Sequence, residues 1–339
     1  MAVGTATGDT AAADPEGLTV SSDPDPLGTS AVAAATAGDA SSGEASTPSV
    51  SVVIPSFRRA DRLISCLDAL AAQDHPRNRF EVIVVDDGSP DPLAPAAETF
   101  RDRLEIRVHR QANAGPAIAR NVGAALAEGD LLVFTDDDCR PHPGWLSALA
   151  RAHHADPDAM LGGHIVNAIR DSRCAEASQL LVSFVYEWFG DDHASRFFAS
   201  NNLAAPREGY FAVGGFDTTF PRPGGEDREL CERWRRSGRR LVEVPDAVID
   251  HHHTMGLRGL IRQHWNYGRG AYDVHRRRAQ AGGGGVRLEP LRFYVRLVTY
   301  PFGRVSRREA VPLAALLVLC QAANAAGFAA ELIAQRRAR

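Results

Sequence analysis

The sequence predicts an α/β fold in which a mostly parallel, Rossmann-like sheet is flanked by helices. Short runs rich in Val, Ile and Leu recur from residue 50 onward, as expected for strands buried on both faces. Segments with helical apolar spacing separate these runs, and such alternation is typical of parallel sheets. Several runs end at polar residues, often Asp. Ligands of these folds bind beyond the carboxyl ends of the strands, so these residues mark the candidate site.

The elements follow in order along the chain. Strands are predicted at 50–55, 80–85, 104–108 and 131–134, each a short apolar run. The intervening helices are predicted from leucines spaced three or four residues apart, or from an apolar stretch that follows a Pro or Trp. The later elements are less regular. The predicted helices are 62–72, 116–127, 145–154, 179–189 and 226–237, and the further strands are 160–169, 241–244 and 247–249.

Composition divides the chain into three parts. Of the 339 residues, 44% are hydrophobic and 24% charged, which excludes a fully disordered chain and a polytopic membrane protein. Residues 1–48 contain seven acids, no base and almost no large apolar side chain, which predicts disorder. Residues 49–255 are the predicted catalytic domain. Residues 256–339 form an Arg-rich helical region, with a flexible hinge predicted at Gly282–Gly285.

The cysteines and the charge pattern suggest where the protein works. Five cysteines are scattered without CxxC spacing, which argues against a disulfide framework or a zinc site. Free cysteines are typical of a protein in the reducing cytosol. From Met255 onward there are 15 Arg and 4 acids. No nucleic-acid partner is predicted.

Three adjacent carboxylates follow the predicted strand 131–134. Like charges at Asp136, Asp137 and Asp138 repel one another unless a cation compensates. In extended backbone alternate side chains share a side, so Asp136 and Asp138 are predicted to face one ion. Carboxylate oxygens suit Mg²⁺ or Mn²⁺ bridged to substrate phosphates. The alternative is a solvated acidic turn.

Two further segments end or follow strands in the same region. Asp86 and Asp87 precede a Gly and could accept hydrogen bonds from a base or ribose, or could merely close a turn. Residues 113–116 open a helix whose N-terminus favours an anion. Arg120 on that helix could contact phosphate, although alone it would be an ordinary surface residue.

Together these segments resemble glycosyltransferase family 2, the nucleotide-sugar-dependent enzymes of the GT-A fold. The resemblance extends from about Ser49 to His253 and includes VSVVIPSFRR, FEVIVVDDGSPD and NAGPAIARNVGAALAEGDLLVFTDDDCRPHPGWL. Downstream, residues 201–204 and 213–217 resemble the family's acceptor-side loop. Gly225-Glu226-Asp227 followed by Leu230 resembles its ED motif. Each segment is weak alone, and the ordered set is specific.

The resemblance implies roles for individual residues. It implies metal-dependent, inverting transfer from a nucleotide-diphosphate sugar to a hydroxyl acceptor, either a glycan or a lipid-linked molecule. Processive members carry Gln-x-x-Arg-Trp, whereas Leu230 stands at the Gln position here, so transfer of a single sugar is expected. The implied residues are Pro55, Ser56, Asp86, Asp87, Arg120 and Asp136 for the nucleotide sugar, Asp136, Asp138 and His251 for the metal, and Asp227 with Glu226 for catalysis.

Alternatives remain at this stage. Asp227 could be only a first-turn carboxylate stabilised by the helix dipole, and the His251–His253 run could be a polar loop. A zinc hydrolase lacks a supporting ligand spacing. A sugar nucleotidyltransferase would need a Gly-rich phosphate loop near residue 55, and a dehydrogenase would need GxGxxG. A non-catalytic sugar-nucleotide-binding scaffold at the membrane is the third alternative.

The C-terminal segment suggests membrane association. Residues 310–330 carry no charge over 21 residues, enough to cross a bilayer, and arginines flank them on both sides. The segment could span the membrane, lie at the interface, or pack on the soluble domain. Attraction of the Arg-rich region to anionic lipid favours the cytoplasmic face of the membrane.

Overall fold

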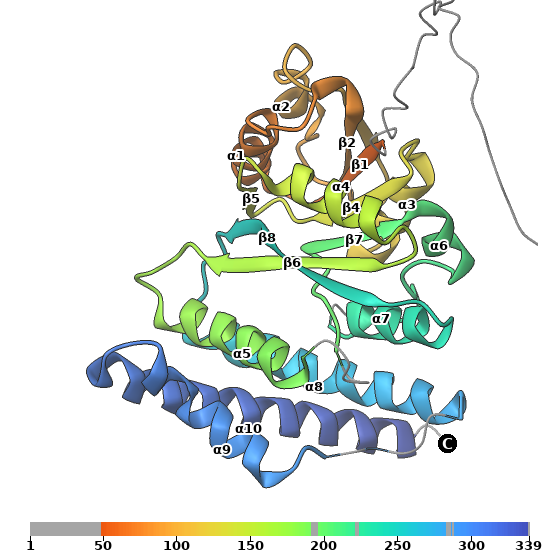
Figure 1. Ribbon diagram of the computed structural model, residues 1–339. Coiled ribbons are helices and arrows are strands. Elements are labelled where there is room, and N and C mark those ends of the chain that lie inside the picture. The colour runs from red at the N-terminus through yellow and green to blue at the C-terminus, as the bar shows by residue number, and fades with distance from the viewer. Residues whose placement is uncertain (1–48, 191–195, 221–223, 283–285, 287, 338–339) are drawn as a thin grey trace, which may run out of the picture. The chain divides into compact units, whose positions relative to one another are not determined.

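The computed structural model describes residues 49–190, 196–220, 224–282, 286 and 288–337 (Figure 1). The predicted disordered segment 1–48 and the glycines 283–285 of the predicted hinge lie outside these residues. Residues 44–339 belong to one compact unit, and the description below concerns that unit.

A mixed sheet with the order β3-β2-β1-β4-β7-β6-β8-β5 forms the centre of the fold. The first four strands run parallel, as predicted, with β1 between β2 and β4. The carboxyl ends of β1, β2 and β4 therefore meet at one edge, which brings the polar strand ends together. The strands are β1 (Val50–Ser56), β2 (Phe80–Asp86), β3 (Ile106–Arg110), β4 (Leu131–Thr135), β5 (Cys139–Pro141), β6 (Met160–Asn167), β7 (Asn202–Pro206) and β8 (Leu241–His251).

One strand differs from the sequence-based expectation. Residues 201–204 were expected in a loop, whereas β7 pairs antiparallel with both β4 and β6. The sequence NLAAP has one large apolar residue and no alternation, so its strand character comes from its neighbours. Among the described residues the sheet is mixed, with four parallel and three antiparallel strand pairings.

Helices cover both faces of the sheet. On β1, neighbouring side chains point to opposite faces: Val52 joins one core with Leu67 and Trp145, and Val53 joins the other with Phe134. The helices are α1 (Ala60–Ala71), α2 (Ala94–Glu98), α3 (Pro116–Leu126), α4 (Trp145–Ala155), α5 (Arg173–Phe189), α6 (Arg207–Ala212), α7 (Glu226–Arg236), α8 (Leu257–Gln280), α9 (Leu291–Thr299) and α10 (Arg307–Arg337), with 3₁₀ turns at Arg77–Arg79 and Tyr300–Gly303.

The C-terminal helices form a layer next to α5 and α7. Figure 1 shows α8, α9 and α10 together beyond β6 and β8, on the far side from β3. The backbones of α8 and α10 approach closely at two glycines. A Cβ on Gly268 would lie 1.9 Å from the Asn324 carbonyl oxygen, and one on Gly327 would lie 2.1 Å from that of Trp265. Only glycine permits this approach.

The helix α10 contains the predicted apolar segment 310–330. It is the one helix of the described residues long and apolar enough to cross a membrane. Its buried positions recur every three or four residues, as in a helix that packs along one side. Near its end Arg269 Nε donates to Glu331 Oε2 at 2.7 Å, an ion pair between α8 and α10. The structure thus shows α10 packed on α8 and α5.

Candidate active site

A cavity of about 2280 Å³ extends from the ends of β1 and β4 to the C-terminal helices. Its walls include Pro55, Ser56 and Asp87 at one end, and the turn after β4 beside them. Glu226 and Asp227 line the same cavity, as do residues of α5, α8 and α10. Of the sequence-predicted site residues, Asp86 is not among those that line it.

The acidic turn after β4 spreads its three carboxylates to different partners. The amide of Cys139 donates to the carbonyl of Asp136 at 3.1 Å, so the backbone turns here instead of continuing extended. The expectation that Asp136 and Asp138 share one direction assumed extended backbone, and the turn removes that assumption. Arg120 Nη2 donates to Asp136 Oδ1 at 2.6 Å. Although burial opposes its charge, Asp136 and Glu226 raise the pKa of Arg120.

Asp138 forms a cluster with two histidines at the end of β8. Ligand atoms of Asp138, His251 and His253 all lie within 4.8 Å of one another. Arg62 Nη1 also donates to Asp138 Oδ2 at 2.9 Å. Burial opposes ionisation of Asp138, but hydrogen bonds from both histidines outweigh it and hold its pKa far below the usual range. One carboxylate with two imidazoles is a donor set that suits Mn²⁺ and other transition metals.

Asp137 joins the first strand to the fourth. Its Oδ2 accepts from Ser56 Oγ at 2.7 Å, and its Oδ1 accepts from Arg59 Nη1 at 3.0 Å. Burial raises its pKa to about 6 despite these partners. The two contacts fix the loop after β1 against the loop after β4, and so position Ser56 at the cavity.

Asp86 and Asp87 organise the end of β2. Asp86 is buried, and its carboxylate accepts from the amides of Ser89 and Leu93 at 2.9 and 3.2 Å. Asp87 accepts from the amides of Ala114 and Gly115, at 2.8 and 2.9 Å, and from side chains of the same loop. Asp87 therefore fixes the start of α3, and only Asp87 of this pair reaches the cavity.

Glu226 and Asp227 open α7 after two glycines in positive φ. Gly224 has φ 126° and Gly225 has φ 110°, and the Gly224 amide donates to Glu226 Oε2 at 2.6 Å. A Cβ on Gly270 of α8 would lie 1.6 Å from the Gly224 carbonyl oxygen, so α8 packs directly on this loop. The C-terminal region thus helps to position the acidic pair.

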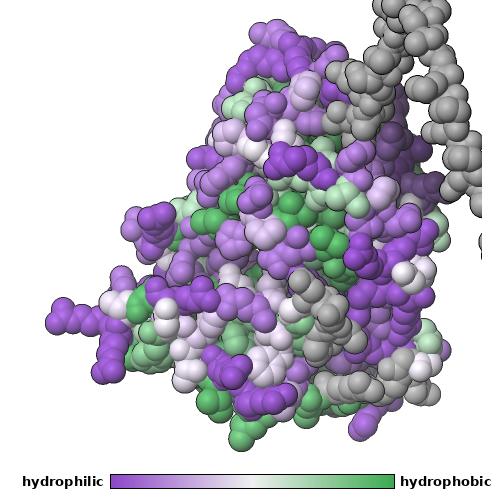
Figure 2. All heavy atoms as spheres, viewed as in Figure 1, coloured by the Kyte–Doolittle hydropathy of each residue, from purple (hydrophilic) through white to green (hydrophobic). Residues whose placement is uncertain are grey.

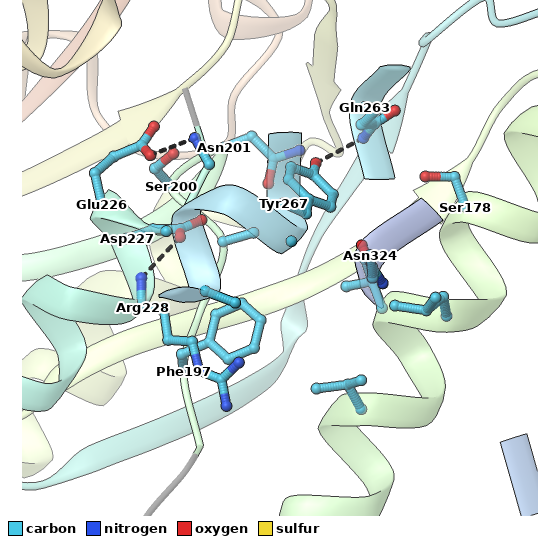
Figure 3. Close-up of a pocket in the computed structure, with 18 of the residues that line it drawn as sticks. Ser178, Phe197, Ser200, Asn201, Glu226, Asp227, Arg228, Gln263, Tyr267 and Asn324 are labelled. Carbon is cyan, nitrogen blue, oxygen red and sulfur yellow. Dashed lines mark hydrogen bonds between the residues drawn. The ribbon is translucent and has the colours of Figure 1, made fainter. Parts of the chain in front are cut away.

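Among the carboxyls that line the cavity in the described part of the chain, Asp227 has the most strongly raised pKa (Figure 3). Its Oδ1 accepts from the amide of Arg228 at 2.7 Å. Burial, and then the charge of Glu226, raise its pKa to about 7, while Arg120 opposes the shift. A carboxyl with such a pKa exchanges its proton near neutrality, as a general base requires.

Sequence reasoning missed several residues that the fold brings to the site. His253 joins the Asp138 cluster, although only His251 was singled out from the three adjacent histidines. Continued extended backbone after the strand would place 251 and 253 on one side, which could have suggested the pair. Arg59 directly precedes α1 and Arg62 lies in its first turn, and no local pattern links either residue to residues 137 and 138.

Comparisons with known proteins agree with this geometry. Residues 51–216 match glycosyl transferase family 2, and residues 180–256 match the N-terminal domain of galactosyltransferase. Glycosyltransferase AglE from Haloferax volcanii is 35% identical over 231 residues, covering 67% of this chain and 74% of AglE. Validoxylamine A glucosyltransferase from Streptomyces hygroscopicus subsp. jinggangensis is 32% identical over 220 residues, covering 56% of this chain and only 52% of that relative.

A solved structure resembles the fold. The mannosyltransferase PcManGT from Pyrobaculum calidifontis, in complex with GDP-Man and Mn²⁺, superposes with a TM-score of 0.58 at 23% identity, covering 84% of this chain and 87% of the other. The fold is that of a GT-A glycosyltransferase. The chain belongs to glycosyltransferase family 2, which confirms the resemblance found in the sequence and excludes the nucleotidyltransferase and scaffold alternatives as its class.

The raised pKa of Asp227 predicts a pH-dependent cost in stability. Between about pH 4, the ordinary value of an unfolded Asp, and pH 7, the folded state binds a proton that the unfolded state does not. Stability therefore falls as pH rises through this range. We expect Asp227→Asn to raise the Tm at pH 8 by at least about 2 °C and to leave it unchanged near pH 4. Asp246→Asn, at an exposed site, is the control. Equal Tm values at pH 8 would contradict the burial argument.

Proposed function

We propose that this glycosyltransferase is metal-dependent and inverting, and that it transfers one sugar from a nucleotide-diphosphate sugar to a hydroxyl group of a glycan or lipid-linked acceptor. The observation that carries the proposal is a shared cavity: the Asp138–His251–His253 cluster and the perturbed Asp227 line the same space. Glycosyl transfer requires a cation near the leaving diphosphate and a base near the acceptor hydroxyl, both close to the anomeric carbon of the donor sugar.

The donor is proposed to bind at the ends of β1, β2 and β4. Pro55, Ser56 and Asp87 line this part of the cavity and would contact the nucleotide. Asp136, oriented by Arg120, would face the diphosphate region. Structures with a similar fold support this class of donor: PcManGT holds GDP-Man, and a TarS structure from Staphylococcus aureus, at 17% identity, holds UDP-GlcNAc.

The metal is proposed to bind at Asp138, His251 and His253, with Asp136 nearby. Two imidazoles beside one carboxylate favour Mn²⁺ over Mg²⁺, which prefers oxygen ligands. The ion would stabilise the charge that develops on the departing nucleoside diphosphate. Arg59 and Arg62 neutralise the same carboxylates and are partly exposed, so their side chains have room to move when a cation binds.

Asp227 is proposed to take the proton of the acceptor hydroxyl. With a pKa of about 7 it is partly ionised at neutral pH and basic enough to accept a proton. Direct attack by the hydroxyl replaces the leaving group in one displacement, which inverts the anomeric carbon. Glu226 would hold the Gly224–Gly225 turn through its bond to the Gly224 amide.

Transfer of a single sugar is supported by the positions of Leu230, Arg233 and Trp234. Leu230 and Trp234 are fully buried in the core. Arg233 binds Glu229 and the carbonyl of Gly215. None of the three is among the residues that line the cavity, so these three side chains would not contact a growing chain there.

Association with the cytoplasmic face of the membrane is proposed through the exposed sides of α9 and α10. Figure 2 shows hydrophobic residues at the lower edge of the view, where α9 and α10 lie. Because α10 packs on α8 and α5 along one side, we propose that it lies at the interface and does not span the membrane. The exposed apolar residues of this layer that do not line the cavity are Leu291, Val295, Phe302, Val311 and Ile333.

The function is tested by incubation with Mn²⁺, a panel of nucleotide sugars and candidate acceptors. We expect one donor to release its nucleoside diphosphate, kcat/KM to rise with pH to a plateau above about 7, and the product to have an inverted anomeric configuration.

Asp227→Asn should lower kcat about 10²–10⁴-fold, because it cannot accept the proton, while donor binding persists. Glu226→Gln should be milder. If Glu226→Gln abolishes transfer and Asp227→Asn does not, the base is misassigned.

Metal binding is tested by calorimetry with Mn²⁺ and nucleoside diphosphate. Asp138→Ala and His253→Ala should each weaken Mn²⁺-dependent binding by at least about tenfold, because each removes a proposed ligand. His252→Ala is the matched control, since His252 is adjacent in sequence but outside the cluster. Equal losses in all three variants, or none, would refute this ligand set.

Membrane association is tested by sedimentation with anionic vesicles at low salt. The full chain should pellet with the vesicles, and the double variant Leu291→Gln/Val295→Gln should pellet less. Ile64→Gln, which changes an exposed apolar residue on α1, should behave like the parent. A parent chain that stays in the supernatant would rule out the proposed docking.

A further inference from the structure

A basic wall lines the cavity beyond Asp227, between α7 and α8. Arg235 and Arg236 follow Arg228 on α7 by seven and eight residues, about two helical turns, so the three lie on one side of the helix. His275 and Arg278 line the same part of the cavity from α8. All five line the cavity. This wall lies outside the proposed donor site at the strand ends, and neither the metal cluster nor the acidic pair uses it.

The arginines outnumber their carboxylate partners. Arg236 and Arg278 share the single oxygen Oε1 of Glu232, at 2.6 and 2.8 Å. Neither Arg228 nor Arg235 forms an ion pair with a carboxylate of the described residues, although the charges of Asp227, Glu232 and Glu289 attract Arg228 from longer range. Burial, and then the neighbouring Arg278, lower the pKa of Arg228. A partly buried cationic cluster with unfilled charge is costly unless an anion completes it.

The wall begins next to the proposed base. Arg228 directly follows Asp227, and Figure 3 shows its side chain directed away from Glu226, beside Phe197. The guanidinium lies 5.5 Å from the centre of the Phe197 ring. An anion held here would therefore lie close to Asp227, on the side away from Glu226.

Beyond the wall the cavity becomes apolar. Its lining there comes from α5, α9 and α10, and includes Leu181, Val185, Phe293, Val318 and Phe328. Apolar groups of a ligand in this part would leave water, while an adjacent anion would keep charged partners. One cavity thus offers a cationic site between a catalytic carboxyl and an apolar chamber.

We propose that the acceptor is a phosphate-bearing amphiphile, whose phosphate binds Arg228, Arg235 and Arg278 and whose apolar part occupies the chamber between α5, α9 and α10. The inference rests on the proposed function, since it supplies the acceptor for the reaction at Asp227. It assigns a second anion site, distinct from that of the donor diphosphate. The acceptor's phosphate is bound and not transferred, so no further bond changes are required.

The experiment measures binding to the full chain with Mn²⁺ and saturating nucleoside diphosphate, so that the donor site is filled. The probes are farnesyl phosphate, farnesol and inorganic phosphate. Farnesyl phosphate should bind at least tenfold more tightly than either of the others. Equal affinity for farnesol would overturn the anion site. Equal affinity for inorganic phosphate would overturn the apolar chamber and indicate a small soluble phosphate ligand instead.

Variants assign the effect to the wall. Arg228→Gln and Arg235→Gln should each weaken farnesyl phosphate binding about tenfold and leave farnesol binding unchanged, because each removes a charged donor. Arg151→Gln, at an exposed position of α4, is the matched control. Binding of Mn²⁺ with nucleoside diphosphate, measured on the same samples, reports folding and the donor site. If that binding persists while the arginine variants keep full affinity for farnesyl phosphate, the inference fails and the proposed function stands.

Discussion

The turn after β4 must neutralise three successive carboxylates in a mostly buried place, and the architecture around the cavity follows from that constraint. Each carboxylate recruits a different element: Asp136 pairs with Arg120 of α3, Asp137 binds Ser56 after β1, and Asp138 contacts the two histidines at the end of β8. Three segments distant in sequence are thereby fixed to one turn. Burying such charges without partners would cost several kcal/mol each.

The acidic pair at the start of α7, Glu226 and Asp227, lies where burial opposes the ionisation of Asp227. Asp227 is held where burial and a neighbouring carboxylate oppose its charge, so the folded state is less stable with it ionised. The strain is local, because positive-φ glycines before α7 and the close approach of Gly270 hold the turn rigidly. The same burial that lowers the free energy of unfolding raises the pKa of Asp227 to about 7. Such a loss of stability at a perturbed carboxyl is typical of catalytic sites.

The C-terminal helices connect the reaction centre to the protein surface. α8 contacts the loop before Glu226 on one side and α10 on the other, through glycines that permit backbone contact. α10 in turn contributes Val318 and Phe328 to the cavity and leaves other apolar side chains exposed. A continuous path of apolar surface next to a cationic wall is what a site for an amphiphilic acceptor near a membrane would require.

The sequence by itself determined the elements whose character is local. Apolar runs gave β1, β2 and β4 nearly to the residue, helical spacing and N-terminal signals gave α3, α4 and α7, and ordered motifs indicated the family. Tertiary structure alone decided the rest. NLAAP becomes a strand because β4 and β6 flank it. Asp86 turns inward to satisfy two amides, whereas Asp87 reaches the cavity. The wall of Arg228, Arg235 and Arg278 exists only where α7 meets α8. These contacts join residues far apart in the chain, and the local sequence around one residue does not determine which distant residue will contact it.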